Sequence, residues 1–137
     1  MPTRVLLADD HPVYREGLAG LIDVCDDMVV VGQASDGAAA LALAEETRPD
    51  VAVLDLNMPD IDGLQATAQM AREVPAVKIV MLTASEEEED LFKAIKAGAR
   101  GYVLKDMPSS QLRSMLHGVL QGEAPISGVM AAKMIEE

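Results

Sequence analysis

Five polar residues stand directly after short apolar runs, and their types suit the transfer of a charged group. They are Asp9, Asp10, Asp55, Thr83 and Lys105. Taken alone, Asp9 and Asp10 are equally compatible with a turn or a helix cap, and Lys105 with a solvated strand end. Together, three carboxylates, a hydroxyl group and an ammonium group indicate one shared site, provided that the fold brings the ends of these runs together.

Carboxylates gathered in one cleft repel each other and shift towards protonation unless a cation neutralises them. Mg²⁺ meets that need, because it prefers oxygen ligands and is commonly held by one or two carboxylates together with phosphate oxygens. An Asp carboxylate can also be the nucleophile that forms an acyl phosphate. Lys105 can neutralise the phosphoryl oxygens, while the Thr83 hydroxyl and the backbone N–H groups after Asp55 can donate hydrogen bonds to them.

The apolar runs themselves predict the strands that position these residues. Most are apolar on consecutive positions, as expected when helices cover both faces of a parallel sheet. They occupy residues 4–8, 28–32, 51–54, 78–82 and 101–104, and segments of helical periodicity alternate with them at about residues 12–23, 36–44, 62–72, 85–98 and 109–120. This alternation predicts a doubly wound α/β sheet, in which ligands bind at the carboxyl ends of the strands.

Local signals mark several of the predicted helix ends. Asp36 can open the second helix. Ser85 followed by Glu88 matches a capping box for the fourth helix, which Gly98 can end. Pro108 suits the first turn of the fifth helix.

Length and composition limit the classes of protein. A chain of 137 residues fits one compact domain. The 11 Lys and Arg against 23 Asp and Glu give a net charge of −12, which should repel nucleic acid and anionic membranes. Cys25, the single cysteine, fits a reducing cytosol, and no apolar run approaches the roughly 18 residues of a membrane-spanning helix. We therefore expect a cytoplasmic protein that binds neither DNA nor membrane through this chain.

In their order along the chain, the motifs resemble those of the receiver domains of two-component response regulators. The matching stretches are Asp9-Asp10, Val53-Leu54-Asp55-Leu56-Asn57-Met58-Pro59-Asp60-Ile61-Asp62-Gly63, Met81-Leu82-Thr83-Ala84 and Gly101-Tyr102-Val103-Leu104-Lys105. The resemblance implies a flavodoxin-like five-stranded sheet of order 2-1-3-4-5 and a signalling domain rather than an enzyme. It implies that a sensor histidine kinase, or acetyl phosphate, phosphorylates Asp55. Mg²⁺ would be bound by Asp10 and Asp55, by Asp9 directly or through water, and by the backbone carbonyl of Asn57.

The resemblance also implies a switch. Thr83 would move towards the phosphoryl oxygens and Tyr102 would turn inward behind it, which reshapes the face made by the fourth helix and fifth strand. The alternative for Tyr102 is a partly buried aromatic residue with no switching role. Asn57 and Ser85 lie two residues past Asp55 and Thr83, where related receivers tune the lifetime of the phosphoryl group.

Within this family the chain resembles the NarL/FixJ (LuxR-type) subgroup. The marks are Ala8-Asp9-Asp10-His11-Pro12, a stretch from Gly98 to Asp106, and Ile126-Ser127-Gly128; Asp106 stands where many other receivers carry Pro. Members of this subgroup normally dimerise on phosphorylation and continue into a helix-turn-helix DNA-binding domain. We therefore expect a receiver domain at residues 1–122, followed at 123–137 by the start of a linker with a short helix at 129–135. The alternative is a stand-alone receiver that acts through protein–protein interaction.

Other chemistries fit the residues less well. An aspartyl-nucleophile phosphatase would require a second Asp two residues after the nucleophile, where this chain has Asn57. A flavin- or nucleotide-binding domain would require a phosphate loop after the first strand, where Asp9 and Asp10 would repel the phosphate. We expect His11 and His117 to take helix-surface or core positions and not to form a metal site or a catalytic site with Cys25.

Overall fold

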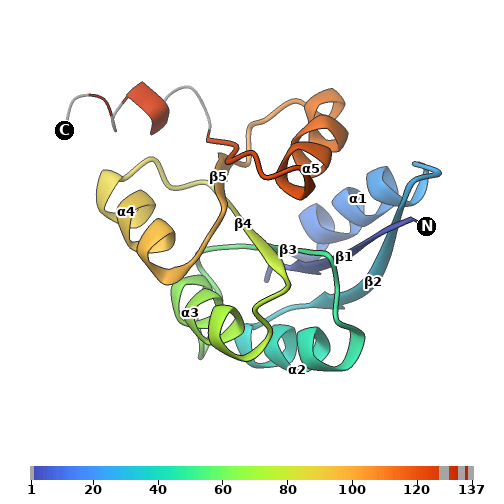
Figure 1. Ribbon diagram of the computed structural model, residues 1–137, viewed down its shortest axis with the longest axis horizontal. Coiled ribbons are helices and arrows are strands. Elements are labelled where there is room, and N and C mark those ends of the chain that lie inside the picture. Colours follow the sequence, from blue (N-terminus) through green and yellow to red (C-terminus); the bar gives the residue numbers. More distant parts are fainter. Residues whose placement is uncertain (1, 127–129, 133–134, 136–137) are drawn as a thin grey trace.

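The computed structural model describes residues 2–126, 130–132 and 135, and shows five parallel strands in the order β2-β1-β3-β4-β5 (Figure 1). The flavodoxin-like order implied by the family resemblance is therefore confirmed. The strands are β1 (Thr3–Ala8), β2 (Met28–Ala34), β3 (Val51–Leu54), β4 (Lys78–Thr83) and β5 (Gly101–Leu104). The helices are α1 (Pro12–Asp23), α2 (Gly37–Thr47), α3 (Gly63–Glu73), α4 (Glu88–Ala97) and α5 (Leu112–Leu120), with a short 3₁₀ helix at Ser109–Gln111.

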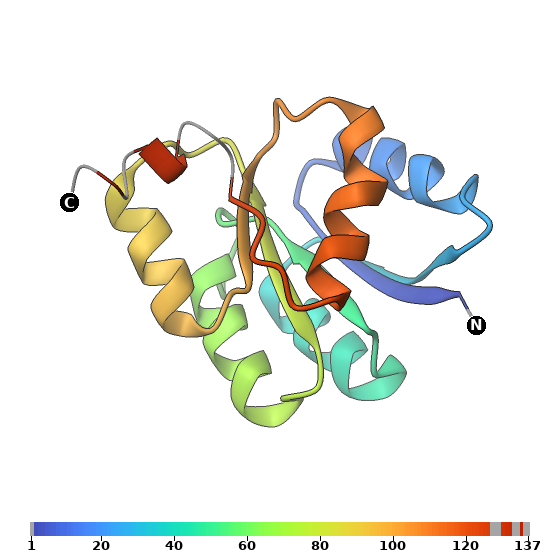
Figure 2. The same cartoon turned by 45° about the horizontal axis from the view of Figure 1, so that its top comes forward.

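Helices cover both faces of the sheet. α1 and α5 lie on one face, and α2, α3 and α4 lie on the other (Figure 2). Every residue of β3 and β5 is buried, which explains why these strands are apolar at consecutive positions. Alternate side chains of each strand enter the two separate cores, so that Leu6 packs with α2 and α3 while Val5 and Leu7 pack with α1 and α5.

Most predicted helix ends agree with the structure. Asp36 caps α2 by accepting a hydrogen bond from the backbone N–H of Ala39 at 2.8 Å, and Gly98 ends α4 with a φ of 121°. Asp62 and Gln65 form a capping box at the start of α3. The fifth helix differs from the prediction in its first turn, since Ser109–Gln111 is 3₁₀ and the α-helix begins at Leu112.

The predicted capping box of Ser85 and Glu88 is wrong. Helix α4 begins at Glu88, and its N-cap is Glu87, whose side chain makes no capping hydrogen bond. The Ser85 hydroxyl instead accepts from the Glu87 N–H at 3.3 Å and donates to Asp90 at 2.5 Å. Ser85 therefore stabilises the turn that precedes the helix, and the capping motif in the sequence is coincidental.

The segment after α5 returns to the edge of the sheet. The N–H of Tyr102 in β5 donates to the carbonyl of Pro125 at 2.9 Å, and Ile126 forms a parallel bridge with Tyr102. Further along, Met130 is fully buried in the core beside β5 and α4. Residues 130–132 and 135 are helical, and the rest of the short helix predicted at 129–135 lies outside the described residues.

Within the described part of the chain, no helix has the length and apolar character needed to cross a membrane.

Candidate functional site

The carboxyl ends of three strands bring Asp9, Asp55 and Lys105 together. β1 pairs with β3 so that Ala8 lies opposite Leu54, which places the next residues, Asp9 and Asp55, side by side. The Asp55 N–H donates to the Ala8 carbonyl at 2.9 Å and thereby extends this pairing. In the same way, the Lys105 N–H donates to the Thr83 carbonyl at 2.8 Å past the end of the β4–β5 pair.

The Lys105 ammonium group lies between the two carboxylates. Its Nζ is 2.7 Å from Asp9 Oδ2 and 3.3 Å from Asp55 Oδ2. All three side chains are largely shielded from water, with exposed fractions of 15% for Lys105, 9% for Asp9 and 3% for Asp55. The ammonium group also lies 4.7 Å from the ring centroid of Tyr14, which is close enough for a cation–π contact. A cation is therefore already held at the point where the carboxylates converge.

Burial and charge act differently on the two carboxyl groups. Burial raises the pKa of Asp55, and the negative charge of Asp9 raises it further, while Lys105 offsets only part of this. Burial also acts to raise the pKa of Asp9, but hydrogen bonds from Lys105 and His11 outweigh it and lower the pKa overall. For Lys105, burial opposes the charged form, yet the two carboxylates outweigh burial and raise its pKa. The surroundings of Asp55 thus disfavour its charged form, whereas those of Asp9 favour it.

His11 completes the cluster, contrary to the expectation that it would take a helix-surface or core position. Its Nδ1 is 2.9 Å from Asp9 Oδ1, 3.1 Å from Asp10 Oδ1 and 3.9 Å from Asp55 Oδ2. Helical periodicity does not reveal this position, because His11 is the N-cap before α1. The sequence signal that could have identified it is its place directly after Asp9 and Asp10.

The donor set of this cluster fits a divalent ion. Asp9, Asp10, His11 and Asp55 each offer one ligand atom, and these atoms all lie within 4.8 Å of one another. Asp10 is the most solvent-exposed of the three carboxylates, at 38%. Asn57, whose backbone carbonyl was expected to be a further ligand, follows Asp55 in the β3–α3 loop, and its N–H donates to Asp55 Oδ1 at 3.4 Å.

Thr83, Ser85 and Tyr102 form a second set of contacts beside the acidic cluster. Thr83 is fully buried, and its hydroxyl oxygen accepts from the Ser85 N–H at 3.2 Å. The Tyr102 ring is also fully buried, and its hydroxyl donates to the Ser85 carbonyl at 3.0 Å. The loop between β4 and α4 therefore connects Thr83 to Tyr102. Among the described residues, no hydrogen bond joins Thr83 to Asp55, so its predicted role with a phosphoryl group stays a prediction.

Residues 5–117 match the family described as the response regulator receiver domain. The chain belongs to this family. Receiver domains are signalling domains, and the acidic cluster of this receiver lies at the strand ends where the sequence placed its candidate site.

Curated relatives of this receiver include transcriptional regulators. The chain is 43% identical over 134 residues to the uncharacterized transcriptional regulatory protein YxjL of Bacillus subtilis (strain 168), with 98% of the chain and 62% of that protein covered. It is 42% identical over 126 residues to the nitrate/nitrite response regulator protein NarL of Escherichia coli (strain K12), with 92% and 58% covered. The receiver thus spans about three fifths of the length of these relatives.

Solved structures show the same fold. A two-component response regulator of the LuxR family from Aurantimonas sp. SI85-9A1 superposes with a TM-score of 0.93 at 34% identity, covering 99% of this chain and 97% of that one. The signal receiver domain of a response regulator from Mycobacterium tuberculosis gives a TM-score of 0.85 at 35% identity, covering 89% and 98%. These likenesses confirm the NarL/LuxR-type assignment of the receiver.

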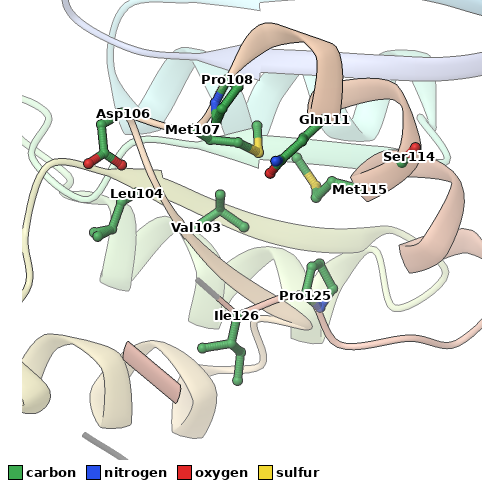
Figure 3. A pocket seen from close by; sticks show the side chains of 10 residues that line it. All are labelled: Val103, Leu104, Asp106, Met107, Pro108, Gln111, Ser114, Met115, Pro125 and Ile126. Atoms are coloured by element: carbon green, nitrogen blue, oxygen red, sulfur yellow. The ribbon is translucent and has the colours of Figure 1, made fainter. Parts of the chain in front are cut away.

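A separate surface pocket of about 740 Å³ lies between β5, α5 and the segment that follows α5 (Figure 3). Val103, Met107 and Met115 line it from the body of the receiver, and Pro125 and Ile126 line it from the returning segment. Asp9, Asp10, Asp55 and Lys105 are absent from its lining. The pocket is therefore distinct from the acidic cluster.

Proposed function

We propose that this receiver accepts a phosphoryl group on Asp55 from the phosphohistidine of a sensor histidine kinase, or from a small donor such as acetyl phosphate. The observation that supports this most directly is the surroundings of Asp55. Its carboxylate is 3% exposed and lies 3.3 Å from the Lys105 ammonium group, with two further carboxylates in the same cluster. Such an arrangement holds a nucleophilic carboxylate next to cationic groups that can neutralise an incoming phosphoryl group.

Mg²⁺ is the ion expected at this site, held by Asp10, Asp55 and the Asn57 carbonyl, with Asp9 binding directly or through water. When bound, it neutralises the carboxylates and the phosphoryl oxygens. The oxygen donors fit this hard cation, and a bound cation would oppose the rise in the pKa of Asp55 that burial and the charge of Asp9 cause. The Asp55 oxygen attacks phosphorus while the bond to the kinase imidazole breaks. Lys105 and the Thr83 hydroxyl would then stabilise the oxygens of the transferred group.

The contacts of Thr83, Ser85 and Tyr102 support a switch that starts at Asp55. Movement of Thr83 towards a phosphoryl oxygen would pull on the Ser85 N–H, and the Ser85 carbonyl would transmit this to the Tyr102 hydroxyl. The affected face is that of α4 and β5. Asn57 and Ser85 would set the lifetime of the phosphoryl group. Tyr102 is already fully buried, so the inward position that the family resemblance implies for the switched state is present in this structure, and the other state would need the ring to leave it.

The relatives are longer than this chain and suggest roles beyond the receiver itself. We infer a cytoplasmic response regulator in which residues 1–122 form the receiver and 123–137 begin a linker to a DNA-binding output domain, with phosphorylation promoting dimerisation. The runner-up is a stand-alone receiver that acts by protein–protein contact. A less favoured alternative is an aspartyl-nucleophile phosphatase, which Asn57 in place of a second Asp argues against.

Incubation with acetyl phosphate and Mg²⁺ tests the phosphoacceptor role. Intact-mass spectrometry should show the gain of one phosphoryl group by the unaltered protein and none by Asp55→Asn. Asp60→Asn is a matched control, because Asp60 is an exposed acidic residue of the same loop with a φ of 65° that Asn tolerates well. A gain in Asp55→Asn equal to that of the unaltered protein would refute the assignment.

A further inference from the structure

His11 places an imidazole nitrogen among the carboxylates of the proposed Mg²⁺ site. Its Nδ1 lies within 3.1 Å of an oxygen of both Asp9 and Asp10, and 3.9 Å from Asp55 Oδ2. The side chain is 66% exposed, and its Nδ1 also lies 3.5 Å from the Lys105 Nζ, which an ion bound here would have to displace. An incoming metal ion can therefore contact the imidazole nitrogen and the carboxylate oxygens at the same time.

The local chain holds the imidazole in this place. Pro12 restricts the backbone of the preceding residue to extended conformations, and His11 has a φ of −98° and a ψ of 99°. The His11 N–H donates to Asp9 Oδ1 at 2.8 Å, which folds the chain back over Asp9. His11 is the N-cap of α1, but its side chain makes no capping hydrogen bond. The ring is thus positioned without having a structural role in the helix.

The chemistry of this mixed donor set differs from that of an all-oxygen site. Mg²⁺ is a hard ion that gains little from imidazole. Zn²⁺, Ni²⁺ and Cu²⁺ bind imidazole nitrogen well and generally exceed the lighter divalent ions in affinity for nitrogen and oxygen sites. The four donor atoms lie within 4.8 Å of one another and therefore suit both Mg²⁺ and these transition-metal ions. Only the transition-metal ions would use the His11 nitrogen as a ligand.

We propose that the site also binds a divalent transition-metal ion of the Zn²⁺, Ni²⁺ or Cu²⁺ class, with His11 Nδ1 as a direct ligand beside the carboxylates. This ion competes with Mg²⁺ for the same oxygens. The inference rests on the proposed metal site, because Asp9, Asp10 and Asp55 serve both ions. His11 then distinguishes the two classes of ion, since its removal weakens only the binding of the transition metal.

Calorimetric titrations with Ni²⁺ and with Mg²⁺ test the proposal on the unaltered protein, His11→Asn and His117→Asn. Asn is a favourable N-cap residue, so His11→Asn should fold normally. His117 is the only other histidine in the sequence and lies on α5, which makes His117→Asn a matched control. We expect His11→Asn to weaken Ni²⁺ binding at least about tenfold, since loss of even an outer-shell partner costs about 10–100-fold. Mg²⁺ affinity should change less than about twofold.

Pulsed electron paramagnetic resonance with Cu²⁺ as the probe gives an independent result. The modulation from imidazole nitrogen should be present in the unaltered protein and in His117→Asn, and lost in His11→Asn. Persistence of that signal in His11→Asn, or Ni²⁺ affinity equal to that of the unaltered protein, overturns the proposal. An equal loss of Ni²⁺ and Mg²⁺ binding in His11→Asn also overturns it, because that would show a general effect on the site.

The variant Asp10→Asn separates this proposal from the proposed function. It should weaken the binding of Mg²⁺ and Ni²⁺ alike, because Asp10 offers an oxygen to both ions. Unchanged Mg²⁺ binding in Asp10→Asn would contradict the metal site itself. If Asp10→Asn weakens the binding of both ions but His11→Asn leaves Ni²⁺ binding unchanged, only the proposed nitrogen ligand is ruled out.

Discussion

At the scale of single residues, Asp9 and Asp55 show that position decides the protonation behaviour of two chemically identical side chains. Both are buried, but Asp9 receives hydrogen bonds from Lys105 and His11 that lower its pKa, while the pKa of Asp55 is raised. Of these two groups, Asp55 is the one whose charged form the surroundings disfavour. A bound cation would oppose this rise in the pKa of Asp55, which suits a residue proposed to react beside a metal ion.

Asp27, which is not part of the acidic cluster, is held by two side chains of α5. Asp27 Oδ2 accepts from Arg113 at 2.9 Å and from His117 at 2.7 Å. The Arg113 hydrogen bond is the main cause that lowers the pKa of Asp27. The pKa of Asp27 is lower in the folded state than in the unfolded state. The Arg113–Asp27 interaction therefore stabilises the fold at pH values above the unfolded-state pKa of Asp27. The stabilisation is lost as the pH falls through the folded pKa.

Replacement of Arg113 by Gln should therefore move the pKa of Asp27 up towards its ordinary value. Nuclear magnetic resonance titration of the Asp27 side-chain carboxyl carbon measures this directly. Arg72→Gln serves as the control, because Arg72 is exposed on α3 across the sheet. An Asp27 titration unchanged by Arg113→Gln would contradict the attribution.

The convergence of Asp9, Asp55 and Lys105 could be foreseen from the sequence, because the carboxyl ends of parallel strands meet at one edge of the sheet. The position of the His11 ring could not be foreseen. It depends on the side-chain torsions of an N-cap residue and on its backbone hydrogen bond to Asp9, neither of which leaves a periodic pattern. The contact of the Tyr14 ring with Lys105 could not be foreseen either, because it joins side chains of distant segments.

At the scale of elements, close approach between a helix and a loop fixes the geometry around Asp55. A Cβ added at Gly63, the first residue of α3, would lie 2.2 Å from the carbonyl oxygen of Asp55. The Gly63 N–H also donates to the Leu56 carbonyl at 2.8 Å. The start of α3 therefore packs directly against the backbone that carries the proposed phosphoacceptor, and only glycine permits this distance.

We expect Gly63→Ala to lower the free energy of unfolding by about 1–3 kcal/mol, as forced overpacking generally does. Urea unfolding measures the change, and amide shifts at Asp55 should report displacement of the loop. Gly17→Ala is the matched control, since a Cβ at Gly17 in α1 meets nothing within 4 Å. That variant should gain about 0.5–1 kcal/mol from helix propensity. Equal stability changes in the two variants would contradict the packing argument.

The alternating apolar runs in the sequence predicted the order of strands and helices. They did not predict where α4 begins or how the segment after α5 packs. Ser85 and Glu88 satisfy a capping motif, yet the helix starts at Glu88 because Ser85 is engaged with Glu87 and Asp90. The return of Pro125 to the edge of β5 depends on Gly101, where a Cβ would lie 2.8 Å from atoms of Pro125. Contacts between distant segments of this kind leave no local signal in the sequence.

Met130 belongs to the segment after α5 and anchors it in the core. Its side chain is fully buried, whereas Ile135 is 85% exposed. Met130→Ala should lower the free energy of unfolding by about 2–5 kcal/mol, as removal of a large core side chain does. Ile135→Ala should change it by less than about 0.5 kcal/mol. If chemical denaturation gives both variants the stability of the unaltered protein, the segment does not belong to the core.

At the scale of the whole molecule, net charge opposes the association of two copies. Each chain has a formal charge of −12, so two copies repel each other at low ionic strength. Salt shortens the range of this repulsion, from a Debye length of about 10 Å at 0.1 M to about 3 Å at 1 M. Apolar contacts such as those available to Val13, which is 85% exposed, are not screened in this way. Any dimer of this receiver should therefore strengthen as salt is added.

We expect beryllofluoride with saturating Mg²⁺ to promote self-association, and more strongly at about 0.5 M than at about 0.1 M NaCl, because salt screens the repulsion between copies. Sedimentation velocity at several protein concentrations measures the shift. Asp55→Asn is the control, since it removes the carboxylate to which beryllofluoride would bind, and it should sediment alike with and without the mimic. Identical sedimentation of the unaltered protein in all conditions would remove dimerisation from the proposed function. Association that weakens as salt rises would instead show that attraction between opposite charges, rather than apolar contact, joins the copies.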